Sequence, residues 1–185
     1  MPDLSTIRRG VIVALTRRLN DKLGRTGLMK LIYFLQTVKE IPLKYDFRLY
    51  TYGPYDSQVL DDLAVTQAWG GVRSRAFHWS AGTGYLLSEG EKASVVMQPA
   101  STEIEKINHD LDWVVGEFGS MSASDLEVAS TIIYVDRDCE MNGEKISESE
   151  LVTRVQQIKR HHDKRKIALE THRLREKQML HSISG

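Results

Sequence analysis

The residues best suited to chemistry are few, and their spacing does not assemble them into a reactive set. The chain has six histidines and one cysteine, Cys139. The adjacent His161 and His162 lack the i, i+4 histidine or carboxylate of a helical metal site, and Cys139 lacks a CxxC partner. The sequence therefore predicts no metal ligands and no cofactor.

Cys139 stands among carboxylates. Asp136, Asp138 and Glu140 surround it, and negative charge raises the pKa of a thiol and so disfavours the reactive thiolate. The same carboxylates would suit a cation or nuclease site, but no second carboxylate motif supports one, and we interpret them as the solvated end of a helix. The sequence also has no P-loop, GxGxxG or GxSxG motif. We expect no catalytic residues and a protein that is not an enzyme.

The composition is that of a globular protein. Of the 185 residues, 41% are hydrophobic and 27% are charged, so a core can form. No apolar run is long enough to span a bilayer, and the N-terminus lacks the layout of a secretion signal. A single cysteine cannot form an internal disulfide and fits a reducing compartment. We expect a cytoplasmic protein with no membrane partner.

The charge is unevenly distributed although its total is zero. The net charges of residues 1–44, 45–100, 101–150 and 151–185 are +6, −2, −10 and +6. One interpretation is a basic surface for nucleic acid or for an acidic protein. The other is that the basic ends fold back onto the acidic middle, or pair with it in a homo-oligomer. The order of charges along the chain leaves both open.

The first hundred residues alternate between helical and strand patterns. Hydrophobic periodicity predicts helices over 5–19, 26–41 and 56–69, a strand over 45–52 and a hairpin over 72–87 with its turn at 81–84. We expect a sharp turn at Gly53-Pro54 and a left-handed helix cap at Gly70-Gly71. This order of elements is that of a winged helix, with the hairpin as the wing.

The remainder of the chain is predicted to be helical. Helices are expected from Thr102, from Ser122 or Ser124, and from Ser147. After His161 the apolar positions become sparse, so this segment should fray or need a partner to order it. We predict a mainly α (α+β) protein. Residues 1–100 form a winged-helix-like core with a small antiparallel sheet, 101–160 a helical bundle packed on the core, and 161–185 a charged C-terminal tail or helix.

A family resemblance centres on residues 28–72. It rests on Lys30, Leu31, Tyr33 and Phe34 in the second helix, on the aromatic strand that follows, on Tyr52-Gly53-Pro54-Tyr55, and on the tyrosine-led return strand before Ser88-Glu89-Gly90. In these features the chain resembles the Panacea-type (SocA-like) antitoxin domain and the related YwgA-like bacterial proteins. The YGPY block is the specific part of a likeness that covers about two thirds of the chain.

The resemblance implies a mainly helical fold with a small sheet and a non-catalytic role. That role is to hold a toxin inactive, or to act as an adaptor that recruits a partner protein, in a toxin–antitoxin or phage-defence system. We expect Tyr52, Gly53, Pro54 and Tyr55 to bind the partner, because tyrosines are favoured interface anchors. The alternative is a purely structural turn with two phenol rings packed beside it.

Arginines supply the candidate contacts for nucleic acid. Arg73 and Arg75 lie on the predicted wing, and Arg17 and Arg18 lie in the first helix, where they could reach phosphates. The alternative for the wing is an edge strand whose charges protect it against self-pairing. A winged-helix transcriptional regulator is therefore the second functional hypothesis.

The helix predicted over 56–69 argues against DNA as the main partner. It contains Asp56, Asp61 and Asp62 but no lysine or arginine. Such a helix would repel a phosphate backbone. We therefore favour a protein partner, a toxin or an effector, with nucleic acid secondary.

Overall fold

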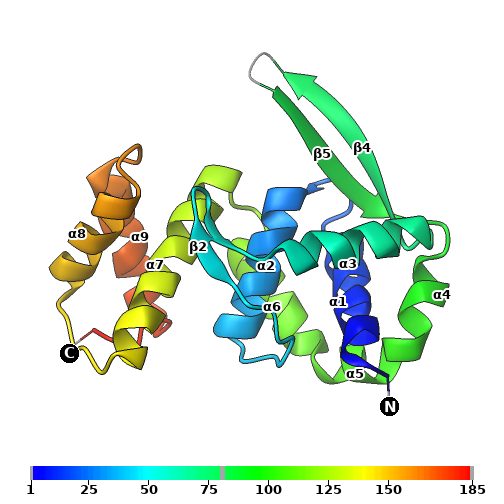
Figure 1. Ribbon diagram of the computed structural model, residues 1–185, viewed down its shortest axis with the longest axis horizontal. Helices are drawn as coiled ribbons and strands as arrows, with labels where there is room; N and C mark the ends of the chain where they lie inside the picture. Colours follow the sequence, from blue (N-terminus) through cyan, green and yellow to red (C-terminus); the bar gives the residue numbers. More distant parts are fainter. Residues whose placement is uncertain (1, 80–81, 184–185) are drawn as a thin grey trace. The chain divides into compact units, whose positions relative to one another are not determined.

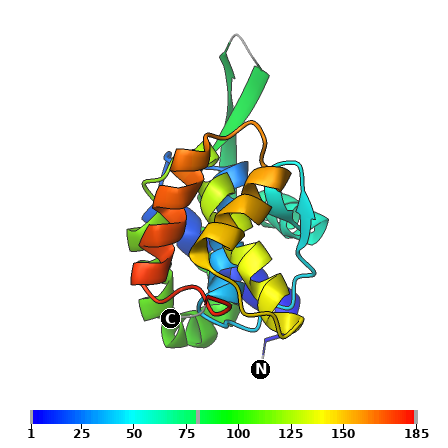
Figure 2. The same cartoon turned by 90° about the vertical axis from the view of Figure 1, so that its left-hand side faces the viewer.

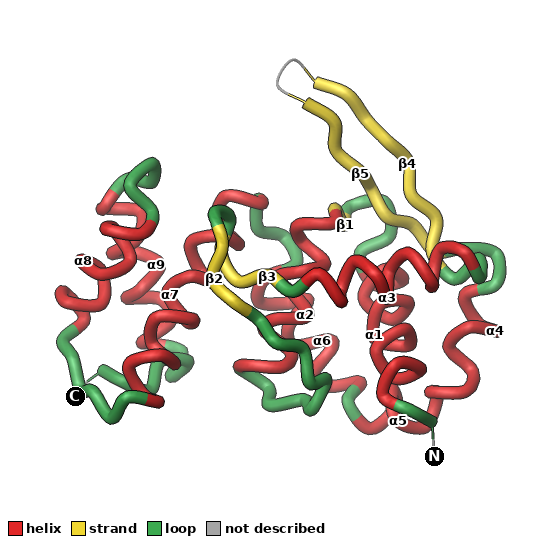
Figure 3. Tube along the Cα trace, in the orientation of Figure 1, coloured by secondary structure: helices red, strands yellow, loops and turns green. Residues whose placement is uncertain are grey.

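The computed structural model describes residues 2–79 and 82–183, which fold into helices and a small amount of antiparallel sheet (Figure 1; Figure 3). The predicted mainly helical α+β class is confirmed. The chain divides into two compact units, one formed by residues 1–47 and 56–121 and the other by residues 48–55 and 122–185. In the described part of the chain, no helix is long and apolar enough to cross a membrane.

The first unit is built around α1. Its helices are α1 (Leu4–Arg18), α2 (Arg25–Thr37), α3 (Ser57–Ala68), α4 (Ala93–Met97), α5 (Ser101–Lys106) and α6 (Asn108–Phe118), with a 3-10 turn, η1 (Gln98–Ala100). Residues 10–16 of α1 are buried on every side, in contact with the other five helices. Helix α2 is also central, as predicted: Leu31 is buried, and the Phe34 ring stacks on Phe118 with centroids 3.9 Å apart.

A three-stranded antiparallel sheet belongs to the same unit. Its strands are β1 (Leu23–Gly24), β4 (Val72–Trp79) and β5 (Gly82–Glu89), in the order β1-β5-β4. The predicted hairpin is confirmed, but its turn was expected at 81–84, and residues 82–84 instead lie in β5; residue 81 of the expected turn lies outside the described residues. The predicted helix cap is also confirmed, since Gly70 has a φ of 76°. The β4–β5 ribbon projects from the helices of its unit (Figure 1).

The second unit combines three helices with a short hairpin. It contains α7 (Ala123–Met141), α8 (Glu148–Ile158) and α9 (Lys164–Glu176), with β2 (Arg48–Tyr50) and β3 (Gly53–Tyr55). Helices α8 and α9 lie side by side (Figure 2). The predicted caps are confirmed: the hydroxyls of Ser122 and Ser147 accept hydrogen bonds from the backbone N–H groups three residues later, each at 3.1 Å.

These two units differ from the segments 1–100, 101–160 and 161–185 expected from the sequence. Helices α5 and α6 pack on α1 in the first unit, and the hairpin of residues 48–55 belongs with α7. Periodicity shows which face of an element is buried but not which distant element covers it, so it could not indicate this grouping of elements.

Residues 162–183 are ordered by contacts within their own chain, so the prediction that the segment after His161 frays or needs a partner is wrong. Ile167, Thr171 and Leu174 are fully buried and recur at helical spacing along α9. They form a narrow stripe that packs against α7 and α8. Three buried positions suffice here because the neighbouring helices cover them, although the rest of α9 is charged.

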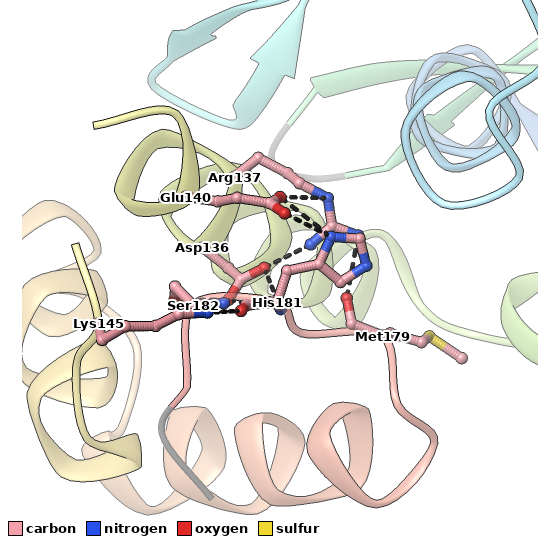
Figure 4. Close-up of polar contacts among 7 residues, drawn as sticks. All are labelled: Asp136, Arg137, Glu140, Lys145, Met179, His181 and Ser182. Carbon is pink, nitrogen blue, oxygen red and sulfur yellow. Dashed lines mark hydrogen bonds and ion pairs between the residues drawn. The ribbon is translucent and has the colours of Figure 1, made fainter. Parts of the chain in front are cut away.

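The residues after α9 are held by a buried carboxylate (Figure 4). Asp136 of α7 is fully buried. Its Oδ1 accepts hydrogen bonds from the N–H of Ser182 at 2.9 Å and from the Ser182 hydroxyl at 2.7 Å. Its Oδ2 accepts from the N–H of His181 at 2.9 Å and is paired with Arg137. The prediction of a solvated helix end is therefore wrong for Asp136, because the returning chain covers it.

Candidate functional site

The YGPY block lies on the β2–β3 hairpin, named the tyrosine hairpin here (residues 48–55). Leu49 pairs with Pro54 and Tyr50 with Gly53. The chain reverses at residues 51–52, so the sharp turn predicted at Gly53-Pro54 is misplaced, whereas the strand predicted over 45–52 is confirmed for residues 48–50. Gly53 has a φ of 91°, which other residues rarely adopt, and this lets the chain leave the turn directly into β3.

The tyrosine hairpin presents aromatic rings to solvent. Tyr52 is 68% exposed and Tyr50 is 59% exposed. Tyr55 is half-buried, and its ring meets that of Tyr50 edge to face with centroids 5.5 Å apart. Gly53 and Pro54 are buried. Of the four predicted binding residues, Tyr52 and Tyr55 can therefore reach a partner, and Gly53 and Pro54 shape the backbone. Tyr50 was not predicted, although alternation along the strand places it on the same face as Tyr55.

A buried lysine holds the turn of the tyrosine hairpin. Lys159, at the end of α8, is 1% exposed and donates a hydrogen bond from Nζ to the carbonyl oxygen of Thr51. The same Nζ lies 2.9 Å from Oε1 of Glu127, on α7. Strand β3 packs on α7 as well. Because a buried ammonium needs a counter-charge and acceptors, these contacts tie the hairpin turn to both helices.

Two histidines complete this polar cluster. Nε2 of His161 lies 3.2 Å, and Nε2 of His162 lies 3.5 Å, from Oε1 of Glu127. Burial raises the pKa of Glu127, but the hydrogen bond and charge of Lys159, with the two histidines, outweigh it and hold that pKa below its ordinary value. Glu127 is therefore ionised at neutral pH. Local spacing in the sequence does not indicate this cluster, because Glu127 lies on α7 and the two histidines lie in the turn between α8 and α9.

The arginines predicted to contact phosphate divide into two pairs. Arg73 and Arg75 are exposed and alternate along β4, so they lie on one face of the ribbon. Arg17 is instead paired with Glu89, and Arg18 with Asp112, each at 2.7 Å. Arg17 and Arg18 line a cavity of about 470 Å³ in the first unit. Arg73 and Arg75 are therefore better placed than Arg17 and Arg18 to contact phosphate groups.

The surface of α3 is less acidic than its sequence predicted. Asp56 caps the helix, and Asp62 is buried, where it accepts a hydrogen bond from the Tyr45 hydroxyl at 2.9 Å. Of the three aspartates only Asp61 is exposed. The Trp69 side chain, at the end of the helix, is 52% exposed. The exposed positions of α3 therefore include one aspartate, and still no lysine or arginine.

Cys139 is buried on α7. Burial raises the pKa of its thiol, and the nearby carboxylates of Glu144 and Asp138 add to this effect, against a lowering contribution from Arg154. Arg154 Nη1 lies 3.3 Å from the sulfur. The predicted rise of the thiol pKa is confirmed, with burial as its largest cause.

No protein-family model matches this chain, and no curated protein is detectably similar to it.

Proposed function

We propose that this chain is a non-catalytic protein-interaction module that binds a partner protein through the tyrosine hairpin. The observation that carries the proposal is the pair of exposed rings, Tyr50 and Tyr52, on a turn held by Lys159. Tyrosines offer a large contact area and few rotatable bonds. A hairpin tied to the helices beneath it loses less conformational entropy on binding than a free loop, and this favours affinity.

The proposed role is that of an antitoxin-like or adaptor subunit that inhibits or recruits its partner. The resemblance of the YGPY block to Panacea-type and YwgA-like proteins supports this role and suggests a toxin–antitoxin or phage-defence setting in the cytoplasm. The partner is then a toxin or another effector protein. We expect the partner to contact the same surface, formed by Tyr50, Tyr52 and Tyr55, whether the chain inhibits it or recruits it.

Comparative co-purification tests the proposal. The tagged chain, the double variant Tyr50→Ser with Tyr52→Ser, and the control Leu169→Ser are expressed in the native host, and co-purifying proteins are quantified. Leu169 is 73% exposed on α9 and so controls for the loss of an exposed apolar group in the same unit. A tyrosine hot spot contributes about 2 kcal/mol, or about 30-fold in affinity. A partner should therefore be retained by the wild type and the control and lost by the double variant.

The opposite pattern would reject the proposal. Equal recovery of every co-purifying protein with the double variant would mean that the tyrosine hairpin binds none of them. Circular dichroism and a thermal melt of each variant establish that the loss is not due to unfolding, since all three side chains are exposed.

A second candidate is a winged-helix regulator that contacts DNA with the β4–β5 ribbon as its wing. The observation that favours it is the projecting ribbon with Arg73 and Arg75 on one face (Figure 1). Since α3 has no lysine or arginine, we expect weak binding that falls steeply with salt.

Fluorescence anisotropy with a labelled duplex tests this second candidate. Arg73→Ala with Arg75→Ala should reduce the slope of log affinity against log salt by about 2, one phosphate contact for each arginine. Arg160→Ala, an exposed arginine of the second unit, is the matched control and should not change it. Tight, sequence-selective binding at physiological salt would rank this role above protein binding, and an unchanged slope in the double variant would exclude the wing.

A further inference from the structure

We propose that Glu127, His161 and His162 form a binding site for a divalent transition metal ion, with Zn²⁺ as the best fit. Glu127 comes from α7, and the histidines come from the turn between α8 and α9. One ligand atom of each residue can be chosen so that all three lie within 4.8 Å of one another. One carboxylate oxygen and two imidazole nitrogens form a donor set that zinc uses in sites with three protein ligands.

The distances match those of a tetrahedral site. With metal–ligand bonds of about 2.0–2.1 Å, neighbouring ligand atoms of a tetrahedron are about 3.3–3.4 Å apart. Oε1 of Glu127 lies 3.2 Å from Nε2 of His161 and 3.5 Å from Nε2 of His162. Two of the three edges therefore already have nearly the length that a bound zinc ion requires.

The buried ring of His162 points independently to a ligand. Its side chain is only 9% exposed, and within residues 2–79 and 82–183 its Nε2 has no hydrogen-bond partner. An unsatisfied buried nitrogen costs free energy, which coordination of a metal ion would remove. His161 is 57% exposed, so solvent reaches the same cluster and can supply both the entry path and a fourth ligand.

Lys159 limits the affinity without blocking the site. A carboxylate has about four lone-pair sites, so Glu127 can accept Lys159 and bind a metal ion together. The ammonium group of Lys159 also donates a hydrogen bond to the carbonyl oxygen of Thr51. Its positive charge repels a second cation, so we expect weaker binding than at a site without a neighbouring lysine.

Calorimetric titration of the metal-free full chain with Zn²⁺ tests the proposal, with Co²⁺ absorption as a readout of tetrahedral coordination. One ion should bind per chain. His161→Gln and His162→Gln should each weaken zinc binding by more than about 10-fold. Loss of a group that only supports a metal ligand already weakens binding by about 10-fold or more, and loss of a ligand should cost more. His172→Gln is the matched control, because His172 is 56% exposed and lies 3.6 Å from another carboxylate, that of Glu148.

The site would be rejected if Zn²⁺ did not bind, if both cluster variants bound it as the wild type does, or if His172→Gln weakened binding equally. His161 is exposed, so His161→Gln should fold normally and keep the test decisive even if His162→Gln does not. The readout is metal binding by the isolated chain, so it is independent of any partner protein.

Discussion

Replacement of Lys159 by Met should destabilise the second unit severely. The change keeps most of the side-chain volume and removes the ammonium group. It leaves Glu127, whose side chain is 8% exposed, without its closest counter-charge, and it leaves the Thr51 carbonyl without this donor. Breaking a buried ion pair by removing one partner costs about 3–5 kcal/mol, against about 0–1 kcal/mol for an exposed pair. With Lys159 only 1% exposed, the larger value applies.

A double-mutant cycle separates the free energy lost with the ion pair from the free energy lost with side-chain packing. Glu127→Gln combined with Lys159→Met should restore part of the stability, because no unpaired charge then remains buried. Urea unfolding followed by circular dichroism gives the free energies, and hydrogen exchange should show faster exchange of residues 48–55 in Lys159→Met. A cost below about 1 kcal/mol, or unchanged exchange in the tyrosine hairpin, would refute the anchoring role of Lys159.

Further predictions follow from the cores of the two units and from Cys139. Leu31→Ala should lower the free energy of unfolding by about 2–5 kcal/mol in urea titrations, since Leu31 is 1% exposed, and a change within error would mean that α2 is not central. Leu174→Ala should lower the free energy of unfolding by a similar amount and make α9 more sensitive to limited proteolysis. Proteolysis at the wild-type rate would contradict the packing of α9. The raised pKa of Cys139 predicts slow reaction with a thiol reagent at pH 8, accelerating at higher pH and on unfolding; a fast native reaction would contradict its burial.

Local rules predicted much of the secondary structure. Ser122, Ser147 and Gly70 cap or end helices where the sequence indicated, because these effects depend only on neighbouring backbone groups. The hairpin turn was placed two residues too late because Gly53-Pro54 is a strong turn signal in isolation. In the structure the positive φ of Gly53 serves the exit from the turn.

Long-range pairing is what the sequence could not reveal. Asp62, Asp136 and Lys159 look like surface charges, yet each is buried with partners far away in the sequence. The cluster of Glu127 with His161 and His162 was missed for the same reason, since its members come from separate elements. Tyr52 was predicted as a contact residue from local signals alone, and it is exposed at the turn.

Site-specific photo-crosslinking tests the central claim most directly. A photoreactive phenylalanine analogue is placed at Tyr52, or at Leu169 as the control, and the chain is irradiated in cells of the native host. Both positions are exposed, at 68% and 73%, so neither substitution should disturb the fold. If the tyrosine hairpin binds a partner protein, position 52 should yield a discrete protein adduct that position 169 does not. Absence of an adduct from position 52, or the same adducts from both positions, would contradict the claim.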